Sequence, residues 1–230
     1  MMCAYTAACG GSEVILLEPN RQLGRKVRIT GKGRCNVTNN CDVKTILQNI
    51  PGDGRFLYSA LSKFSPADTM TFFESLGVPL KTERGNRVFP VSDKANDIAD
   101  ALANALLDAG VRVVQGSAKG IVTEQGRVTA VSTTVGRIDC DAAVLCTGGR
   151  SYPATGSTGD GYRFAKQLGH TVTATRASLV PLESDDPCCG EMQGFSLRNV
   201  VLTAFDESGK KLYSELGEML FTHFGVSGPL

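Results

Sequence analysis

A short segment between Gly24 and Asn39, GRKVRITGKGRCNVTN, concentrates residue types that bind anions, with five basic residues, three glycines and no acid. A guanidinium can hold a pyrophosphate as a two-pronged donor, an ammonium acts as a point charge, and glycines let the backbone approach a ligand closely. The alternative role of such a charge run is a solvated basic face. The candidate ligands that this chemistry selects are Arg25, Lys26 and the backbone of Gly33.

Glu18 directly follows a short apolar run, Glu13–Leu17, whose composition is typical of a buried parallel strand. In a dinucleotide-binding βαβ unit, an acid at the end of the second strand accepts hydrogen bonds from a ribose, roughly 20 residues after a G-x-G-x-x-G loop. No glycine precedes Gly10, so we expect the first strand and its loop to lie upstream of Met1. The alternative is that Glu18 is only a polar residue at a strand end.

A second glycine-rich segment, Gly148–Gly161, follows another apolar run, Ala142–Cys146. We expect this run to be a buried strand, and the glycines after it to bring backbone close to a cofactor. The alternatives are an ordinary turn at a strand end and, for Asp160, a capping role at the start of a helix that ends near Gly169. The candidate ligands here are Thr147, Gly148, Gly149 and Asp160.

The composition is that of a globular protein without a strong overall field. The chain has 230 residues, 42% of them hydrophobic and 20% charged, and its net charge is +1. Residues 21–39 contain no aromatic side chain, which argues against nucleic acid as a partner, because single-strand-binding surfaces combine charge with aromatic stacking platforms. No apolar run approaches the roughly 20 residues that a transmembrane helix needs, so we also expect no membrane partner.

The eight cysteines lack the spacing of a C-x-x-C pair or of a metal site. The first residues, MMCAYTAAC, lack the basic start and the long apolar stretch of a secretory signal. We therefore expect a cytoplasmic protein without a metal, whose cysteines are reduced and mostly buried.

The order of predicted elements indicates an α/β fold. Alternating helices and buried strands favour a parallel sheet, here followed by a three-stranded meander that crosses over it. From Ser178 the pattern changes to short antiparallel strands, so we predict a Rossmann-like domain over 1–177 and part of a β-rich domain over 178–230. The predicted elements are a helix over 2–9, a strand over 13–17, a helical insertion over about 42–77, a hairpin over 80–90, a helix capped by Ser92 that runs to Ala109, a strand over 111–115, a meander over 118–124, 127–133 and 136–139, and late strands over 199–205, 211–213 and 219–221.

Four segments of the sequence resemble a known family, the BaiN-like, aminoacetone-oxidase-like NAD(P)/FAD-dependent oxidoreductases. The resemblance implies FAD as cofactor in the domain over 1–177, NAD(P)H as a transient hydride donor, and a small-molecule substrate. It also implies that the chain is an internal part of such a flavoprotein, truncated at both ends. The segments, in order, are LLEPNRQLGRKVRITGKGRCNVTN, RVFPVSDKANDIADAL, LCTGGRSYPATGSTGDGY and LFTHFGVSGP.

The resemblance also implies roles for individual residues. Glu18 is expected to bind the adenosine ribose of FAD, and the backbone of Ala118 to contact adenine. The resemblance places five further residues near the flavin ring, where amide and hydroxyl groups tune its electronics: Arg34, Cys35, Asn36, Thr38 and Asn39. No catalytic acid or base is identified, and Cys35 has no resolving cysteine at a suitable spacing. Two other hypotheses stay open: a non-catalytic remnant that does not hold FAD, and a nucleic-acid-binding module built on the basic loop.

Overall fold

The computed structural model describes residues 1–177 and 180–228. The chain divides into two compact units, Met1–Val172 and Thr173–Leu230, and each is described by itself. The domain boundary predicted between residues 177 and 178 adjoins residues 178 and 179, which lie outside the described ranges.

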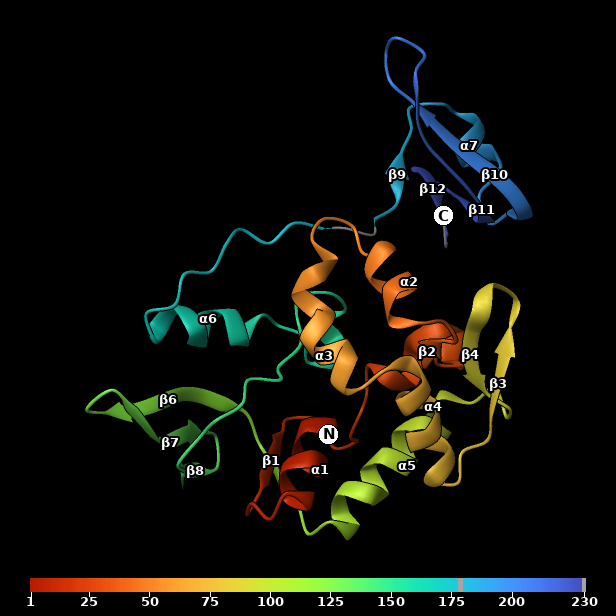
Figure 1. The fold of residues 1–230 in the computed structure, drawn as a ribbon. Helices are drawn as coiled ribbons and strands as arrows, with labels where there is room; N and C mark the ends of the chain where they lie inside the picture. Colours follow the sequence, from red (N-terminus) through yellow and green to blue (C-terminus); the bar gives the residue numbers. More distant parts are fainter. Residues whose placement is uncertain (178–179, 229–230) are drawn as a thin grey trace. The chain divides into compact units, whose positions relative to one another are not determined.

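The first unit contains a parallel pair of strands, β1 (Ile15–Glu18) and β5 (Arg112–Gln115) (Figure 1). Their register places Glu18 opposite Gln115 at the carboxyl end of the pair. The chain between the two strands contains helices, as a parallel connection requires. The predicted α/β class with a parallel sheet is therefore confirmed.

Two helices pack beside the parallel strands, α1 (Met2–Cys9) and α5 (Ala95–Asp108). Apolar residues recur along one face of α5 at helical spacing, and burial of that face provides most of the stability of such a helix. Ala4, Leu106 and Val111 form one buried cluster, which joins α1, α5 and the start of β5.

Helix α5 begins at Ala95, two residues later than a cap at Ser92 would place it. Asp93 adopts a left-handed φ of +57°, so the chain turns once more before the helix starts. Ser92 lies in this turn, where its hydroxyl donates to the Asp97 carboxylate at 2.5 Å and accepts from the Lys94 amide at 3.3 Å. The prediction that Ser92 is the N-cap was therefore wrong.

The chain between β1 and α5 forms the predicted helical insertion and hairpin. Ser65 starts one of the helices with a capping box, exchanging hydrogen bonds with Asp68, and Pro66 takes the first helical position. The strands of this region form an antiparallel sheet in the order β2-β4-β3. The elements are β2 (Thr38–Asn39), α2 (Val43–Gln48), α3 (Tyr58–Lys63), α4 (Pro66–Ser75), β3 (Leu80–Glu83) and β4 (Arg87–Pro90).

The predicted meander is present with the predicted bounds. Its antiparallel strands follow one another in the order β6-β7-β8, and the second glycine-rich segment further on leads into helix α6, as expected. The elements are β6 (Ala118–Glu124), β7 (Arg127–Thr133), β8 (Gly136–Asp139) and α6 (Asp160–Gln167).

The apolar run Ala142–Cys146 is not a strand in the structure. The side chains of Val144 and Leu145 are exposed, Val144 by 70%. A buried strand of a parallel sheet needs neighbours, and within 1–177 and 180–228 no strand pairs with this run. The prediction of a buried strand was therefore wrong. The apolar composition indicated burial, but among the described residues no neighbouring strand pairs with this run and covers it.

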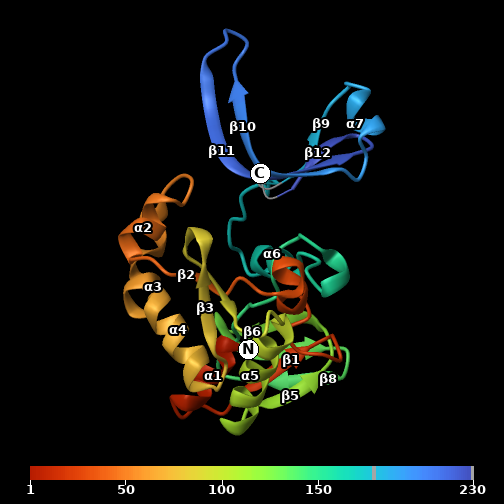
Figure 2. The same cartoon turned by 90° about the vertical axis from the view of Figure 1, so that its right-hand side faces the viewer.

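The second unit is an antiparallel sheet in the order β10-β11-β12-β9. Its longest feature is the β10–β11 hairpin, which turns at Ser208 and Gly209 as predicted (Figure 2). Two of the predicted strands, 211–213 and 219–221, are parts of one continuous strand, because β11 stays paired with β10 between them. The elements are β9 (Leu182–Glu183), α7 (Cys188–Glu191), β10 (Ser196–Phe205), β11 (Lys211–Thr222) and β12 (Gly225–Ser227).

All eight cysteines are free thiols. Only Cys35 and Cys189 are buried, while Cys3, Cys9 and Cys146 are exposed, so the expectation that most are buried was wrong. In the described part of the chain, no helix has both the length and the apolar character needed to cross a membrane.

Candidate functional site

Glu18 lies at the carboxyl end of β1, where ligands bind in open α/β sheets. Its Oε1 accepts two hydrogen bonds from Asn20, from the backbone amide at 2.9 Å and from Nδ2 at 2.6 Å. Among the described residues, no hydrogen bond or ion pair engages the second oxygen, Oε2. One carboxylate oxygen is thus fixed by the turn after β1, and the other can accept from a ligand.

Asn20 connects the end of β1 to the second glycine-rich segment. Its Nδ2 also donates to the Thr155 carbonyl at 3.2 Å, and its Oδ1 accepts from the exposed Arg25 guanidinium at 3.1 Å. Gly156 approaches the same amide, since a Cβ there would lie 3.0 Å from Asn20 Nδ2. The predicted ligands Glu18 and Arg25 are therefore brought together through a residue that sequence reasoning had not selected.

The half-buried Lys26 is directed to the same loop. Its ammonium nitrogen lies 2.7 Å from the Ser151 carbonyl, 3.3 Å from the Ser151 hydroxyl and 2.5 Å from the Ser157 hydroxyl. The basic segment and the second glycine-rich segment, separated by more than a hundred residues, are thus side by side in the structure.

The turn Thr147-Gly148-Gly149 packs closely on residues that follow it. Gly148 has a φ of +74°, and a Cβ there would lie 2.7 Å from the Ser157 hydroxyl. A Cβ on Gly161 would collide with the Thr147 hydroxyl, and one on Gly149 would meet the Tyr162 hydroxyl at 3.6 Å. Gly148 and Gly161 therefore have no room for a Cβ, whereas the contact at Gly149 is an ordinary van der Waals distance.

Asp160 is the first residue of α6, so it does not cap the helix as the alternative reading of the sequence held. Gly159, with a φ of +84°, is the N-cap and contributes no side-chain bond. The Asp160 carboxylate accepts from Thr158 at 2.8 Å and pairs with Arg163 at 2.9 Å. Arg163 first and then Thr158 lower the pKa of Asp160, and its charge also suits a helix N-terminus.

Arg34 is committed to an ion-pair network on the hairpin. Its guanidinium donates to Glu83 at 2.5 Å and to Asp93 at 2.6 and 2.8 Å, and it lies 4.1 Å above the ring centre of Phe89. Lys81 adds a contact to Asp93 at 2.7 Å. Lys81 and then Arg34 lower the pKa of Asp93, and Arg34 lowers that of Glu83.

Cys35 belongs to the hydrophobic core. It packs with Val78, Ala95 and Ile98, and burial raises the pKa of its thiol. Its φ of +59° is unusual for a residue other than glycine, and Gly33, two residues earlier, also has a positive φ, of +85°. A protonated, buried thiol is a poor nucleophile, which argues against a redox role for Cys35.

Among the other predicted ligands, Asn36 binds backbone carbonyls with its side chain, and Thr38 and Ala118 take part in strand pairing. Assigned from its surroundings, the Asn36 amide nitrogen donates to the carbonyls of Val88 at 3.2 Å and Thr38 at 3.0 Å, and Thr38 pairs with Val88 in the hairpin sheet. Ala118 opens the meander opposite Thr133. The chain just before Ala118 stays close to β1, because the Gly116 amide donates to the Glu18 carbonyl at 3.0 Å.

The candidate residues thus form two groups. The first surrounds the end of β1 and the second glycine-rich segment. The second follows the hairpin sheet and consists of Arg34, Cys35, Asn36 and Thr38. Sequence reasoning missed four residues of the first group, and the only signal for them was their position in the polar strings PNR and SYPATGS that follow two predicted strands. These four residues are Asn20, Ser151, Thr155 and Ser157.

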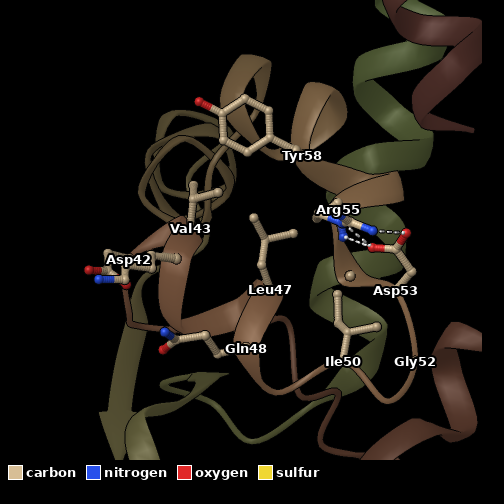
Figure 3. A pocket seen from close by; sticks show the side chains of 11 residues that line it. Asp42, Val43, Leu47, Gln48, Ile50, Gly52, Asp53, Arg55 and Tyr58 are labelled. Atoms are coloured by element: carbon tan, nitrogen blue, oxygen red, sulfur yellow. Dashed lines mark hydrogen bonds and ion pairs between the residues drawn. The ribbon is translucent and has the colours of Figure 1, made fainter.

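A separate hollow of about 950 Å³ lies on the helical insertion (Figure 3). Leu47, Val43 and Tyr58 form its apolar wall, and the paired Asp53 and Arg55 lie at its edge, 2.8 Å apart. None of the predicted ligands lines it. Within the described residues, no three His, Cys, Asp or Glu side chains are grouped so that they could hold a metal ion.

Comparison with known proteins identifies relatives along nearly the whole chain. The family model described as HI0933-like protein Rossmann domain matches residues 1–227. A 3-dehydro-bile acid delta(4,6)-reductase from Clostridium scindens is 29% identical over 219 residues, which is 95% of this chain and 52% of that protein. Ribosomal RNA dihydrouridine synthases from Escherichia coli and Haemophilus influenzae are 30% and 31% identical, covering 100% of this chain and 56% of each relative.

The chain therefore spans about half the length of the curated relatives it matches. The match to the family model extends over nearly all of this chain, across both units. The relationship that the four sequence segments indicated is confirmed, and this chain belongs to the HI0933-like family of Rossmann-domain proteins.

Proposed function

We propose that this chain binds FAD at the carboxyl end of β1 and forms the cofactor-binding part of a flavin-dependent oxidoreductase. The observation that carries the proposal is Glu18, which ends a parallel strand beside a glycine-rich loop and has one carboxylate oxygen without a partner among the described residues. A ribose diol needs such an acceptor. Family membership supports the same conclusion.

The residues of the first group suit the other parts of FAD. Arg25 is an exposed guanidinium next to Glu18 that can pair with a pyrophosphate. Gly148 and Gly156 lack a Cβ, which leaves room for the Ser157 hydroxyl and the Asn20 amide and lets the loop pack closely beside the end of β1. The chemistry that FAD supplies when bound is hydride transfer, here proposed from NAD(P)H to an organic acceptor or to oxygen.

The names of the relatives suggest a narrower reaction class. A delta(4,6)-reductase and a dihydrouridine synthase both produce a saturated carbon–carbon bond, one in a bile acid and the other in a pyrimidine of RNA. We therefore include in the proposal the reduction of an electron-poor carbon–carbon double bond. A small-molecule substrate, as expected from the sequence, is part of the proposal, and RNA is the competing substrate that the assay has to test.

The first test is the visible absorption spectrum of the purified chain with added FAD, recorded after desalting. We expect a retained flavin band, and we expect Glu18→Gln to weaken FAD binding roughly 10- to 100-fold, since hydrogen bonds to a charged group contribute about 1.5–3 kcal/mol. Glu13→Gln, at an exposed position before β1, is the matched control. A folded chain without a retained band would support the hypothesis of a non-catalytic remnant.

The second test follows the flavin band after anaerobic addition of NADH or NADPH. If the band bleaches, acceptors are added: an unsaturated ketone, a uridine-containing RNA, and oxygen. Reoxidation by the ketone alone would support the small-molecule reading. Reoxidation by RNA would overturn the expectation that nucleic acid is not a partner.

A further inference from the structure

The ammonium of Lys26 has all of its hydrogen-bonding capacity occupied by one loop. A lysine ammonium has three N–H donors, and three oxygens of Ser151 and Ser157 lie within 3.3 Å of Nζ. A phosphate would have to displace one of these partners to reach the nitrogen. The contacts therefore argue against the role of direct pyrophosphate ligand that the sequence suggested for Lys26.

Ser157 contacts both the Lys26 ammonium and the glycine turn at Gly148. Its side chain is a buried polar group, and the residue is only 5% exposed. Its hydroxyl accepts from Lys26 at 2.5 Å and lies 2.7 Å from the position that a Cβ on Gly148 would take. A displaced Ser157 would change the space available to Gly148, so the position of the ammonium and the shape of the turn are linked.

A second connection holds the same loop from the side of β1. Asn20 donates to the Thr155 carbonyl, and Gly156 lies against the Asn20 amide. Residues 151–157 are thus fixed at two points to the segment 20–26, one neutral and one charged. Arg25 makes its single hydrogen bond among the described residues to Asn20 and none to the loop.

We propose that Lys26 is a positioning residue, which holds residues 151–157 and, through Ser157, the Gly148 turn in a binding-competent shape before any ligand is present. Contact with a phosphate is then left to Arg25. The identity of the ligand rests on the proposed function, whereas the ordering of the loop by Lys26 does not.

The test is hydrogen exchange of the whole chain without FAD, with Lys26→Met, Lys26→Arg and the exposed control Lys63→Met. The amides of Thr155, Gly156 and Thr158 make hydrogen bonds within the loop and report on its order. We expect Lys26→Met to speed their exchange at least roughly tenfold, Lys26→Arg to restore part of the protection because it keeps a cationic donor, and Lys63→Met to change nothing. If Lys26 acted only as a direct phosphate ligand, Lys26→Met would leave hydrogen exchange in the loop of the ligand-free chain unchanged. That result would overturn the proposal.

A double-mutant cycle with Ser157→Ala separates action through the loop from a general loss of charge. If Lys26 acts through Ser157, the loss of protection in the double variant will be clearly smaller than the product of the two single effects. Independent, multiplicative effects would overturn the proposal. Ser157→Ala keeps the charge, so it is informative even if Lys26→Met does not fold: we expect it alone to speed exchange of the same amides, and an unchanged rate would overturn the proposal. Hydrogen exchange is measured without FAD, so a failure of the chain to bind FAD would not affect this test of the proposal.

Discussion

Replacing Gly148 with alanine tests the close packing of the glycine turn directly. The new Cβ would be placed 2.7 Å from the Ser157 hydroxyl, closer than real Cβ contacts. Gly148 also has a φ of +74°, which alanine adopts only with strain. Gly169 provides a matched control, because its φ is +86° and a Cβ there would meet nothing within 4 Å.

The two substitutions share one energetic cost and differ in the other. Left-handed strain should lower the free energy of unfolding by about 1 kcal/mol for either alanine. At Gly148 the Ser157 hydroxyl must also move, which breaks its bond to the Lys26 ammonium, and hydrogen bonds to charged groups contribute about 1.5–3 kcal/mol. We therefore expect a loss of about 1 kcal/mol for Gly169→Ala and about 3 kcal/mol for Gly148→Ala.

The assay is urea unfolding followed by circular dichroism, with the midpoint compared at an unchanged m-value. Binding of FAD to each variant is measured in parallel, and only Gly148→Ala is expected to weaken it. If the two variants lose the same free energy of unfolding to within about 0.5 kcal/mol, the contact between Gly148 and Ser157 does not restrain the turn. The reasoning about a rigid glycine turn would then be refuted.

Three further predictions concern the rest of the first unit. Arg28→Met should lower the free energy of unfolding by about 2 kcal/mol, because the Arg28 side chain is only 9% exposed and its guanidinium makes three hydrogen bonds. Arg21→Met, at an exposed position, should change it little in the same urea experiment. The lowered pKa of Asp93 means that its ion pairs stabilise the fold above the unfolded value near 4 and are lost as the pH falls through the lowered pKa, so the stability difference between wild type and Asp93→Asn should shrink below about pH 4. Brief maleimide labelling followed by peptide mapping should modify Cys9 at least roughly ten times faster than the buried Cys35; equal rates would contradict the core position of Cys35.

Elements that depend on local sequence signals were predictable. The capping box at Ser65 specifies where α4 begins, and the apolar spacing of α5 specifies which face it buries. The start of α5 was not predictable from Ser92, because the intervening turn depends on Asp93. That carboxylate is held by Lys81 and Arg34, which come from other parts of the chain.

The candidate site was predictable where one residue and its neighbours in sequence carry the signal. Glu18 follows an apolar run, and the structure places it at the end of a parallel strand. Lys26 was selected for its charge, but its partners lie 125 and 131 positions away along the chain. A charge run shows that a cation is present, but it does not show which oxygen that cation meets.

The same distinction explains the contrast between Arg34 and Arg25. Both belong to one basic, glycine-rich string, and sequence alone gives them similar roles. In the structure, two carboxylates and an aromatic ring hold Arg34 in place, while Arg25 is exposed and makes one hydrogen bond to a neutral amide among the described residues. A guanidinium that already has two carboxylate partners gains little from a phosphate and would have to give up those partners to bind it. Of the two arginines, Arg25 is therefore the one whose charge remains available to a ligand.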